Sequence, residues 1–98
     1  MIRHYVIFKL NYPEDSVAAQ NFFNAAKELA SIPGVEKFES LRQISKKNNY
    51  DFGLSMQFAN EVSYGHYNTH PLHVNFITKY WLPCVAEFME IDYEPLVK

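Results

Sequence analysis

The sequence has 98 residues, of which 48% are hydrophobic and 16% aromatic, so we expect a single packed domain over residues 1–98. Nine Lys and Arg oppose eleven Asp and Glu, and the net charge of -2 argues against a nucleic-acid partner. No apolar run approaches the roughly twenty residues of a membrane span, and the first ten residues lack a signal-peptide pattern. With Cys84 as the sole cysteine, a reducing cytoplasm is the expected location.

The first half of the chain predicts strand, helix, strand. Residues 2–10 alternate with a period of two and are rich in β-branched and aromatic side chains, which is typical of a strand. Asp15 or Ser16 can cap a helix that runs to about Ser31, where Pro33 and Gly34 stop it. Residues 35–43 predict a charged edge strand, and residues 45–49 a polar turn.

The second half predicts strand, helix, strand again. Residues 50–58 show the clearest alternation, and Asn60 can cap a helix over residues 61–69. Pro71 starts a new helical segment that Pro83 ends, and residues 85–93 form a last strand. The order β-α-β-β-α-β predicts an α+β, ferredoxin-like sandwich: a four-stranded antiparallel sheet with helices on one face.

The other face of this sheet needs a cover. A partly apolar surface in water favours a partner, and a twofold homodimer through the open sheet face is the commonest solution. The alternative is a half-polar surface that stays in water. We place on this face Tyr5, Ile7, Phe38, Ser40, Gly53, Ser55, Ala86 and Phe88.

Histidines are the candidates for chemistry. His66, His70 and His73 would share one face of an unbroken helix, but Pro71 interrupts it, so we expect no metal site. His4 and His73 should point into one apolar space between helices and sheet, where an imidazole can act as a base near neutral pH. A tyrosine hydroxyl such as that of Tyr67 can donate to a developing oxyanion there.

Three segments resemble the stress-responsive dimeric A/B barrel (Dabb) family. The sequence opens on IRHYVIFKL, similar to the family's H-x-V-x-F-K start, and YNTHPLHVNF matches its Y-x-x-H-P-x-H-x-x-F signature. IDYEP is similar to its D-Y-x-P close. The resemblance implies ferredoxin-like subunits whose sheets pair in a dimeric barrel.

The resemblance also implies site roles. In a polyketide cyclase of the family, olivetolic acid cyclase, the signature tyrosine and second histidine carry an aldol condensation, and they match Tyr67 and His73. The first-strand histidine lines the pocket and matches His4, and an aspartate whose carbonyl orients the base matches Asp92. A further pocket histidine on the third strand is replaced here by Phe52.

Three functions stay open at this point. The chain could be a cofactor-free, cyclase-like enzyme acting on a small aromatic or polyketide-like molecule, a non-catalytic stress-associated dimer that binds a ligand or serves structure, or a cofactor-free monooxygenase of the antibiotic-biosynthesis type. In the first reading His73 is the base and Tyr67 the donor. The pocket residues would be His4, Phe52, His70, Tyr80, Trp81 and Asp92. In the second, the same side chains are ordinary core and rim residues.

Overall fold

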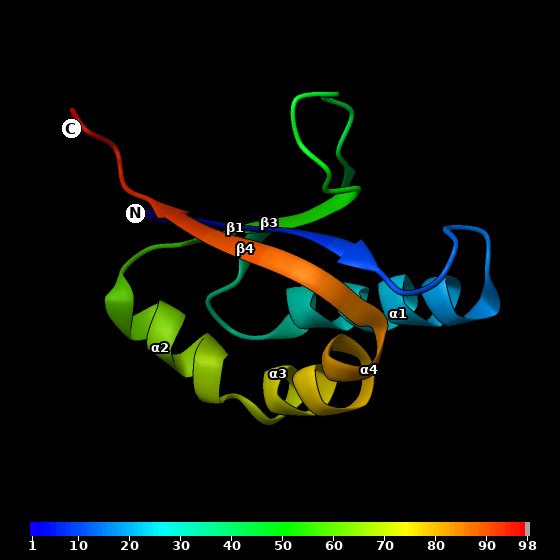
Figure 1. The fold of residues 1–98 in the computed structure, drawn as a ribbon. Coiled ribbons are helices and arrows are strands. Elements are labelled where there is room, and N and C mark those ends of the chain that lie inside the picture. Colours follow the sequence, from blue (N-terminus) through cyan, green and yellow to red (C-terminus); the bar gives the residue numbers. More distant parts are fainter. Residues whose placement is uncertain (98) are drawn as a thin grey trace.

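A computed structural model describes residues 1–97. All helices lie on one side of a single sheet, and the N-terminus lies near the end of the last strand (Figure 1). None of the helices in residues 1–97 has the length and apolar character that crossing a bilayer requires. The elements are β1 (Ile2–Leu10), α1 (Val17–Lys27), η1 (Glu28–Ser31), β2 (Glu36–Arg42), β3 (Phe52–Phe58), α2 (Glu61–Thr69), α3 (Pro71–Phe76), the π-helix η2 (Ile77–Trp81), α4 (Leu82–Cys84) and β4 (Val85–Tyr93).

The sheet has the strand order β2-β3-β1-β4, and every neighbouring pair is antiparallel. This confirms the predicted α+β, ferredoxin-like fold and the edge position of β2. His4, Val6 and Phe8 of β1 lie opposite Met56, Leu54 and Phe52 of β3, and all six are buried under the helices. The strict alternation of these two central strands therefore sets the helix-facing side of the sheet.

Local capping explains where the helices begin. The side chains of Ser16 and Asn60 accept hydrogen bonds from the backbone of α1 and α2, as their cap positions predict. His70 is extended and its Nδ1 accepts from the Leu72 N–H at 3.1 Å, so the break before Pro71 is confirmed. Pro83 does not end the last helix: it lies in the first turn of α4, where a missing N–H is tolerated, and the chain leaves the helix after Cys84.

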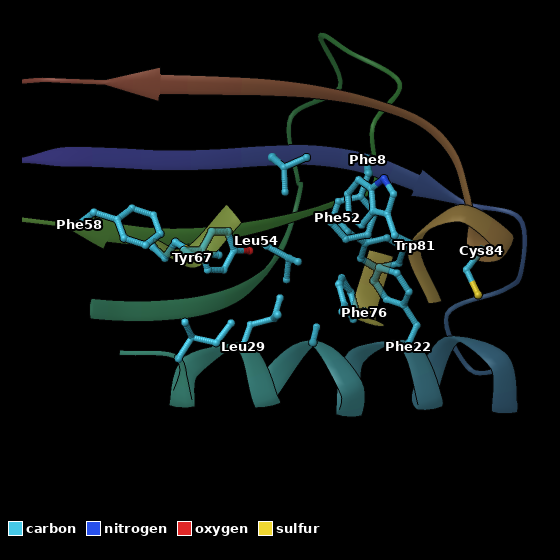
Figure 2. Packing of buried hydrophobic residues seen from close by; sticks show 14 residues of the cluster. Phe8, Phe22, Leu29, Phe52, Leu54, Phe58, Tyr67, Phe76, Trp81 and Cys84 are labelled. Atoms are coloured by element: carbon cyan, nitrogen blue, oxygen red, sulfur yellow. The ribbon is translucent and has the colours of Figure 1, made fainter. Parts of the chain in front are cut away.

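The core is an aromatic layer between α1 and the sheet. Phe8 and Phe22 are fully buried, with ring centroids 5.5 Å apart, and Trp81 lies 5.1 Å from Phe8. Figure 2 shows this cluster at one end of the core and Tyr67 with Phe58 at the other. Cys84 is buried at the aromatic end, as expected for a small apolar side chain.

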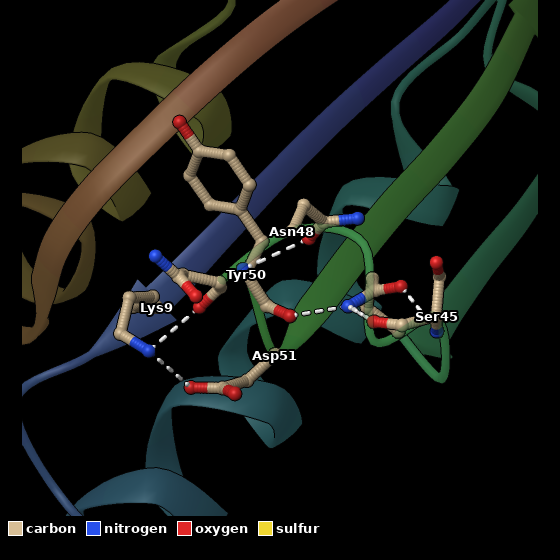
Figure 3. Close-up of polar contacts among 7 residues, drawn as sticks. Lys9, Ser45, Asn48, Tyr50 and Asp51 are labelled. Carbon is tan, nitrogen blue, oxygen red and sulfur yellow. Dashed lines mark hydrogen bonds and ion pairs between the residues drawn. The ribbon is translucent and has the colours of Figure 1, made fainter.

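The β2–β3 connection is the predicted polar turn, tied back to the sheet at its base (Figure 3). Lys9 donates to the carbonyl oxygen of Asn49 at 2.6 Å and to the Asp51 carboxylate at 3.2 Å. The side-chain amide of Gln43 donates to the carbonyl oxygen of Tyr50. The loop therefore extends from the sheet at the end away from α2.

The open face of the sheet differs in part from the prediction. Tyr5, Ile7, Gly53 and Ser55 lie there as expected, in two facing pairs of β1 and β3. Phe38, Ser40 and Phe88 do not: Phe38 packs against the core, Ser40 pairs with helix-facing Leu54, and Phe88 contacts Trp81 edge-on. Register shows that the apolar residues added to this face are instead Leu41, Met89, Ile91 and Tyr93.

Two β-bulges cause this difference. Between the pairs Glu36–Gln57 and Glu39–Ser55, β2 has one residue more than β3, and Lys37 there has a positive φ of 51°. In β4, Ala86 is the extra residue opposite the junction of Lys9 and Leu10. Each extra residue reverses the in-out alternation along the rest of its strand. The open face is consequently more apolar than the sequence predicts.

Candidate functional site

A small cavity of about 50 Å³ lies between β1, β3, β4 and the helices. Four predicted site residues reach it together, namely His4, Tyr67, His73 and Trp81. The two imidazoles therefore share one hollow, as the sequence predicts. The rest of the wall consists of Val6, Leu29, Leu54, Met56, Phe76, Ile77 and Glu90. This makes the site an apolar chamber with two imidazoles, one phenol and one carboxylate on its wall.

Asn68 determines which ring nitrogen of His73 carries the hydrogen. The Asn68 carbonyl oxygen lies 3.0 Å from Nδ1 of His73, and a carbonyl can only accept, so Nδ1 carries the hydrogen. Burial lowers the pKa of His73 below its ordinary value of about 6.5, although the Asn68 hydrogen bond opposes this shift. At neutral pH the ring is therefore neutral, with its lone pair on Nε2. That is the form a general base needs.

Tyr67 is buried next to this base, and its ring centroid lies 4.3 Å from that of His73. Within residues 1–97 its hydroxyl makes no hydrogen bond to another side chain or to the backbone. Burial raises the pKa of Tyr67 well above its ordinary value, and the Glu90 carboxylate adds to this effect. Tyr67 is therefore a protonated donor whose hydrogen is free for a ligand.

His4 belongs to a second hydrogen-bonded group on the cavity wall. Its Nδ1 lies 2.5 Å from Oδ1 of Asp92, so Nδ1–H donates to the carboxylate. The hydroxyl of Tyr64 lies 2.9 Å from Oδ2 of Asp92 and 2.9 Å from Nδ1 of His4. Burial and the hydrogen bond to Asp92 raise the pKa of Tyr64 above its ordinary range. The carboxylate holds His4 with Nε2 as its acceptor nitrogen in the neutral form.

The structure gives Asp92 a different role from the one that the resemblance implies. Its carboxylate binds His4 and Tyr64, while the carbonyl that orients His73 belongs to Asn68. His4 and Asp92 are also a register pair of β1 and β4, which fixes their closeness. Asp92 thus positions the first-strand histidine through its side chain.

Sequence reasoning missed three polar residues of the site, Tyr64, Asn68 and Glu90. Tyr64 precedes Tyr67 by three positions on α2, which places both on one helix face, so this spacing could have revealed it. Glu90 lies two residues before Asp92 on β4 and shares its side of the strand. It could have been found by counting back from Asp92 rather than forward across the bulge.

Four predicted site residues do not line the cavity: Asp92, which contacts it only through His4, and Phe52, His70 and Tyr80. Phe52 packs against Phe8 at the aromatic end of the core, and their ring centroids are 5.8 Å apart. His70 caps α3, and Tyr80 stacks on Phe76 with centroids 6.0 Å apart. None of the His, Cys, Asp and Glu side chains in residues 1–97 forms a group of three or more that could hold a metal ion.

A family model described as the stress responsive A/B barrel domain (Dabb) matches residues 2–95. The chain belongs to the Dabb family. No curated protein matches this Dabb chain significantly. Among solved structures, a Dabb family protein with a ferredoxin-like fold from Mesorhizobium loti is 48% identical, with a TM-score of 0.94, over 98% of this chain and 97% of that one.

More distant structures share the architecture of this Dabb chain. A dimeric ferredoxin-like protein from Bacteroides fragilis is 26% identical, with a TM-score of 0.71, over 95% of this chain and 94% of that one. A hydroxynitrile lyase from Passiflora edulis is 11% identical, with a TM-score of 0.81, over 94% of this chain and 90% of that one. At 11% identity the second likeness concerns the fold alone.

Proposed function

We propose that this Dabb protein is a cofactor-free acid–base enzyme that acts on a small carbonyl compound of the aromatic or polyketide-like class. One observation carries the proposal: a neutral imidazole, that of His73, and a protonated phenol, that of Tyr67, line the same apolar cavity with ring centroids 4.3 Å apart, and the phenol has no hydrogen bond within residues 1–97. A base beside a hydrogen-bond donor is what removal of a proton next to a carbonyl requires. The fold is compatible with catalysis, because the Passiflora edulis protein of this fold is a lyase.

The proposed step is proton abstraction from the carbon beside the carbonyl. Nε2 of His73 takes the proton, the C–H electron pair forms the C=C bond of an enolate, and the negative charge moves to oxygen. The Tyr67 hydroxyl donates to that oxygen. The enolate carbon then either recovers a proton from His73 or attacks a second carbonyl of the same molecule, as in an aldol closure. In the second case the π electrons of that carbonyl form an alkoxide, which takes the proton from Nε2 of His73 and restores the neutral base.

The size of the cavity limits what enters it. A volume of about 50 Å³ holds a few water molecules, whereas an engineered cavity that binds benzene measures roughly 150 Å³. An aromatic ring therefore does not fit, and the cavity takes a compact group such as a methyl ketone. The remainder of a larger substrate must lie outside it.

A homodimer through the open sheet face is part of the same proposal. Tyr5, Ile7 and Ile91 supply apolar surface there, and Gly53 and Ser55 keep the centre of the face low. The Bacteroides fragilis protein with this fold is dimeric, which supports the same assembly here. A second copy would cover a surface that no helix of residues 1–97 covers.

Deuterium exchange tests the catalytic proposal. Acetone, which matches the proposed compact group, is incubated with the protein in D₂O, and loss of its methyl proton signal is followed by NMR. We expect exchange above the buffer rate, reduced by roughly a hundredfold or more in His73→Gln and at least tenfold in Tyr67→Phe. Tyr80→Phe is the matched control, because Tyr80 lies outside the cavity.

Two results would contradict the proposal. Exchange at the buffer rate in the wild type, with His73→Gln changing only the melting temperature, would favour a structural or ligand-binding dimer. Oxygen consumption with a dihydroxyarene, without ketone exchange, would favour a monooxygenase.

A further inference from the structure

We call the cavity that His4, Tyr67 and His73 line the inner cavity. A second and much larger cavity lies beside it, between α2 and the ends of β1 and β4. Its volume is about 480 Å³, within the range of small-molecule sites in proteins, and about ten times that of the inner cavity. We call it the α2 groove. It is lined by Ile2, Glu61, Tyr64, Gly65, Asn68, Asp92, Tyr93 and Glu94.

Three residues lie between the α2 groove and the inner cavity, and each of them contacts one of the two cavity histidines. Tyr64 and Asp92 line the groove, and both bind Nδ1 of His4 on the inner side. Asn68 also lines the groove, and its carbonyl binds His73. The groove is therefore linked by hydrogen bonds to both imidazoles, to His4 through Tyr64 and Asp92 and to His73 through the Asn68 carbonyl.

Gly65 points to a ligand in this groove. It lies inside α2 with an ordinary helical backbone, and a Cβ added there would meet no atom within 4 Å. Glycine destabilises a helix interior relative to alanine, and neither a positive φ nor close packing requires it at this position. Because Gly65 has no side chain, the part of the groove that it lines stays open.

The polar groups of the groove select the class of ligand. Glu61, Asp92 and Glu94 supply carboxylates, and the residues lining the groove include no Lys or Arg. The acidic wall repels anionic ligands and accepts hydrogen bonds from hydroxyl groups. Tyr64, Tyr93 and Ile2 offer flat and apolar surface for a ring.

We infer that the α2 groove binds the body of the substrate, a neutral phenolic ring, while its carbonyl end reaches the inner cavity once the Tyr64 side chain, which separates the two spaces, moves aside. The inference rests on the proposed function for the position of the carbonyl end. It also gives the ring, which the inner cavity is too small to hold, a place beside the base. Gly65 is then a determinant of substrate specificity.

Binding is tested first, by ¹⁵N-HSQC titration of the full chain with 4-(4-hydroxyphenyl)butan-2-one. We expect saturable shifts at the amides of Glu61, Gly65 and Asn68, and apparent binding at least tenfold weaker in Gly65→Leu. The melting temperature of Gly65→Leu should rise by roughly 4 °C, because leucine favours the helix. His66→Leu is the control, since His66 is exposed on the same helix but does not line the groove, and its binding should equal that of the wild type.

Exchange kinetics then separate this inference from the proposed function. We expect Gly65→Leu to lower the ratio of kcat/KM for the phenolic ketone to that for acetone at least tenfold. Groove shifts without exchange of either ketone would support the groove and refute the enzyme. Shifts located elsewhere, or unchanged in Gly65→Leu, would overturn the groove even if acetone exchange is fast.

Discussion

Asn68 and His73 are joined across the break between α2 and α3, with the Asn68 carbonyl oxygen 3.0 Å from Nδ1 of His73. Asn68 lies in the last turn of α2, where backbone carbonyls have no partner within the helix. The sharp turn at His70 and Pro71 brings the next helix back so that an imidazole satisfies this carbonyl. A structural requirement of a helix end thereby fixes the tautomer of the proposed base.

The loss of a hydroxyl should change the free energy of unfolding differently at two tyrosines of α2. Tyr64→Phe removes hydrogen bonds to Asp92 and His4 and should lower the free energy of unfolding by about 1 kcal/mol. Tyr67→Phe removes a hydroxyl that has no hydrogen bond within residues 1–97, so the stability of this variant should stay the same or rise slightly, while ketone exchange falls at least tenfold. Urea denaturation and exchange assays on both variants measure the contrast. A Tyr67→Phe variant that loses stability but not activity would assign Tyr67 to the core alone.

Stability should fall as the pH drops below about 6.5, in part through His73. Burial lowers its pKa in the folded state, so below about 6.5 the unfolded chain binds more protons than the folded one. The stabilisation is complete above the unfolded pKa and is lost as pH falls toward the lower folded pKa. His73→Gln should therefore lose less stability between pH 7.5 and pH 5.5 than the wild type, as measured by urea denaturation. An equal loss in both would show that His73 does not titrate in this way.

The open sheet face should respond to a single charge. Ile7 lies at its centre, opposite Gly53 and Met89, so Ile7→Lys places an ammonium group in the proposed dimer interface. Sedimentation should give the wild type twice the chain mass of 11.5 kDa and the variant the mass of one chain. Val17→Lys, at an exposed position of α1, is the control and should remain dimeric. A wild type that sediments as one chain at micromolar concentration would contradict the dimer.

Sequence pattern predicted the fold because its strongest signals are local. The period-two alternation of β1 and β3, the caps Ser16 and Asn60, and the helix break before Pro71 each depend on neighbouring residues and on backbone chemistry. The faces of β2 and β4 were assigned wrongly at Phe38, Ser40 and Phe88, because a bulge inserts one residue without any consistent sequence signal.

The site was predictable to the extent that it lies on those regular elements. His4 follows from the alternation of β1, and Tyr67 and His73 follow from helix faces that must cover the sheet. Asn68 acts through a tertiary hydrogen bond of its backbone carbonyl, which no spacing rule gives directly. Phe52 was expected in the pocket from the resemblance, but the cavity lies farther along β3, at Leu54 and Met56.

The most direct test of the account is the tautomer and titration of His73, read from ¹⁵N NMR of the imidazole nitrogens in selectively labelled protein. We predict a neutral ring at pH 7 with the hydrogen on Nδ1, an unprotonated Nε2, and a midpoint below about 6.5. The Nε2 signal should shift when 4-(4-hydroxyphenyl)butan-2-one is added. A ring that is protonated at pH 7, or that carries its hydrogen on Nε2, would contradict the assignment of His73 as the base.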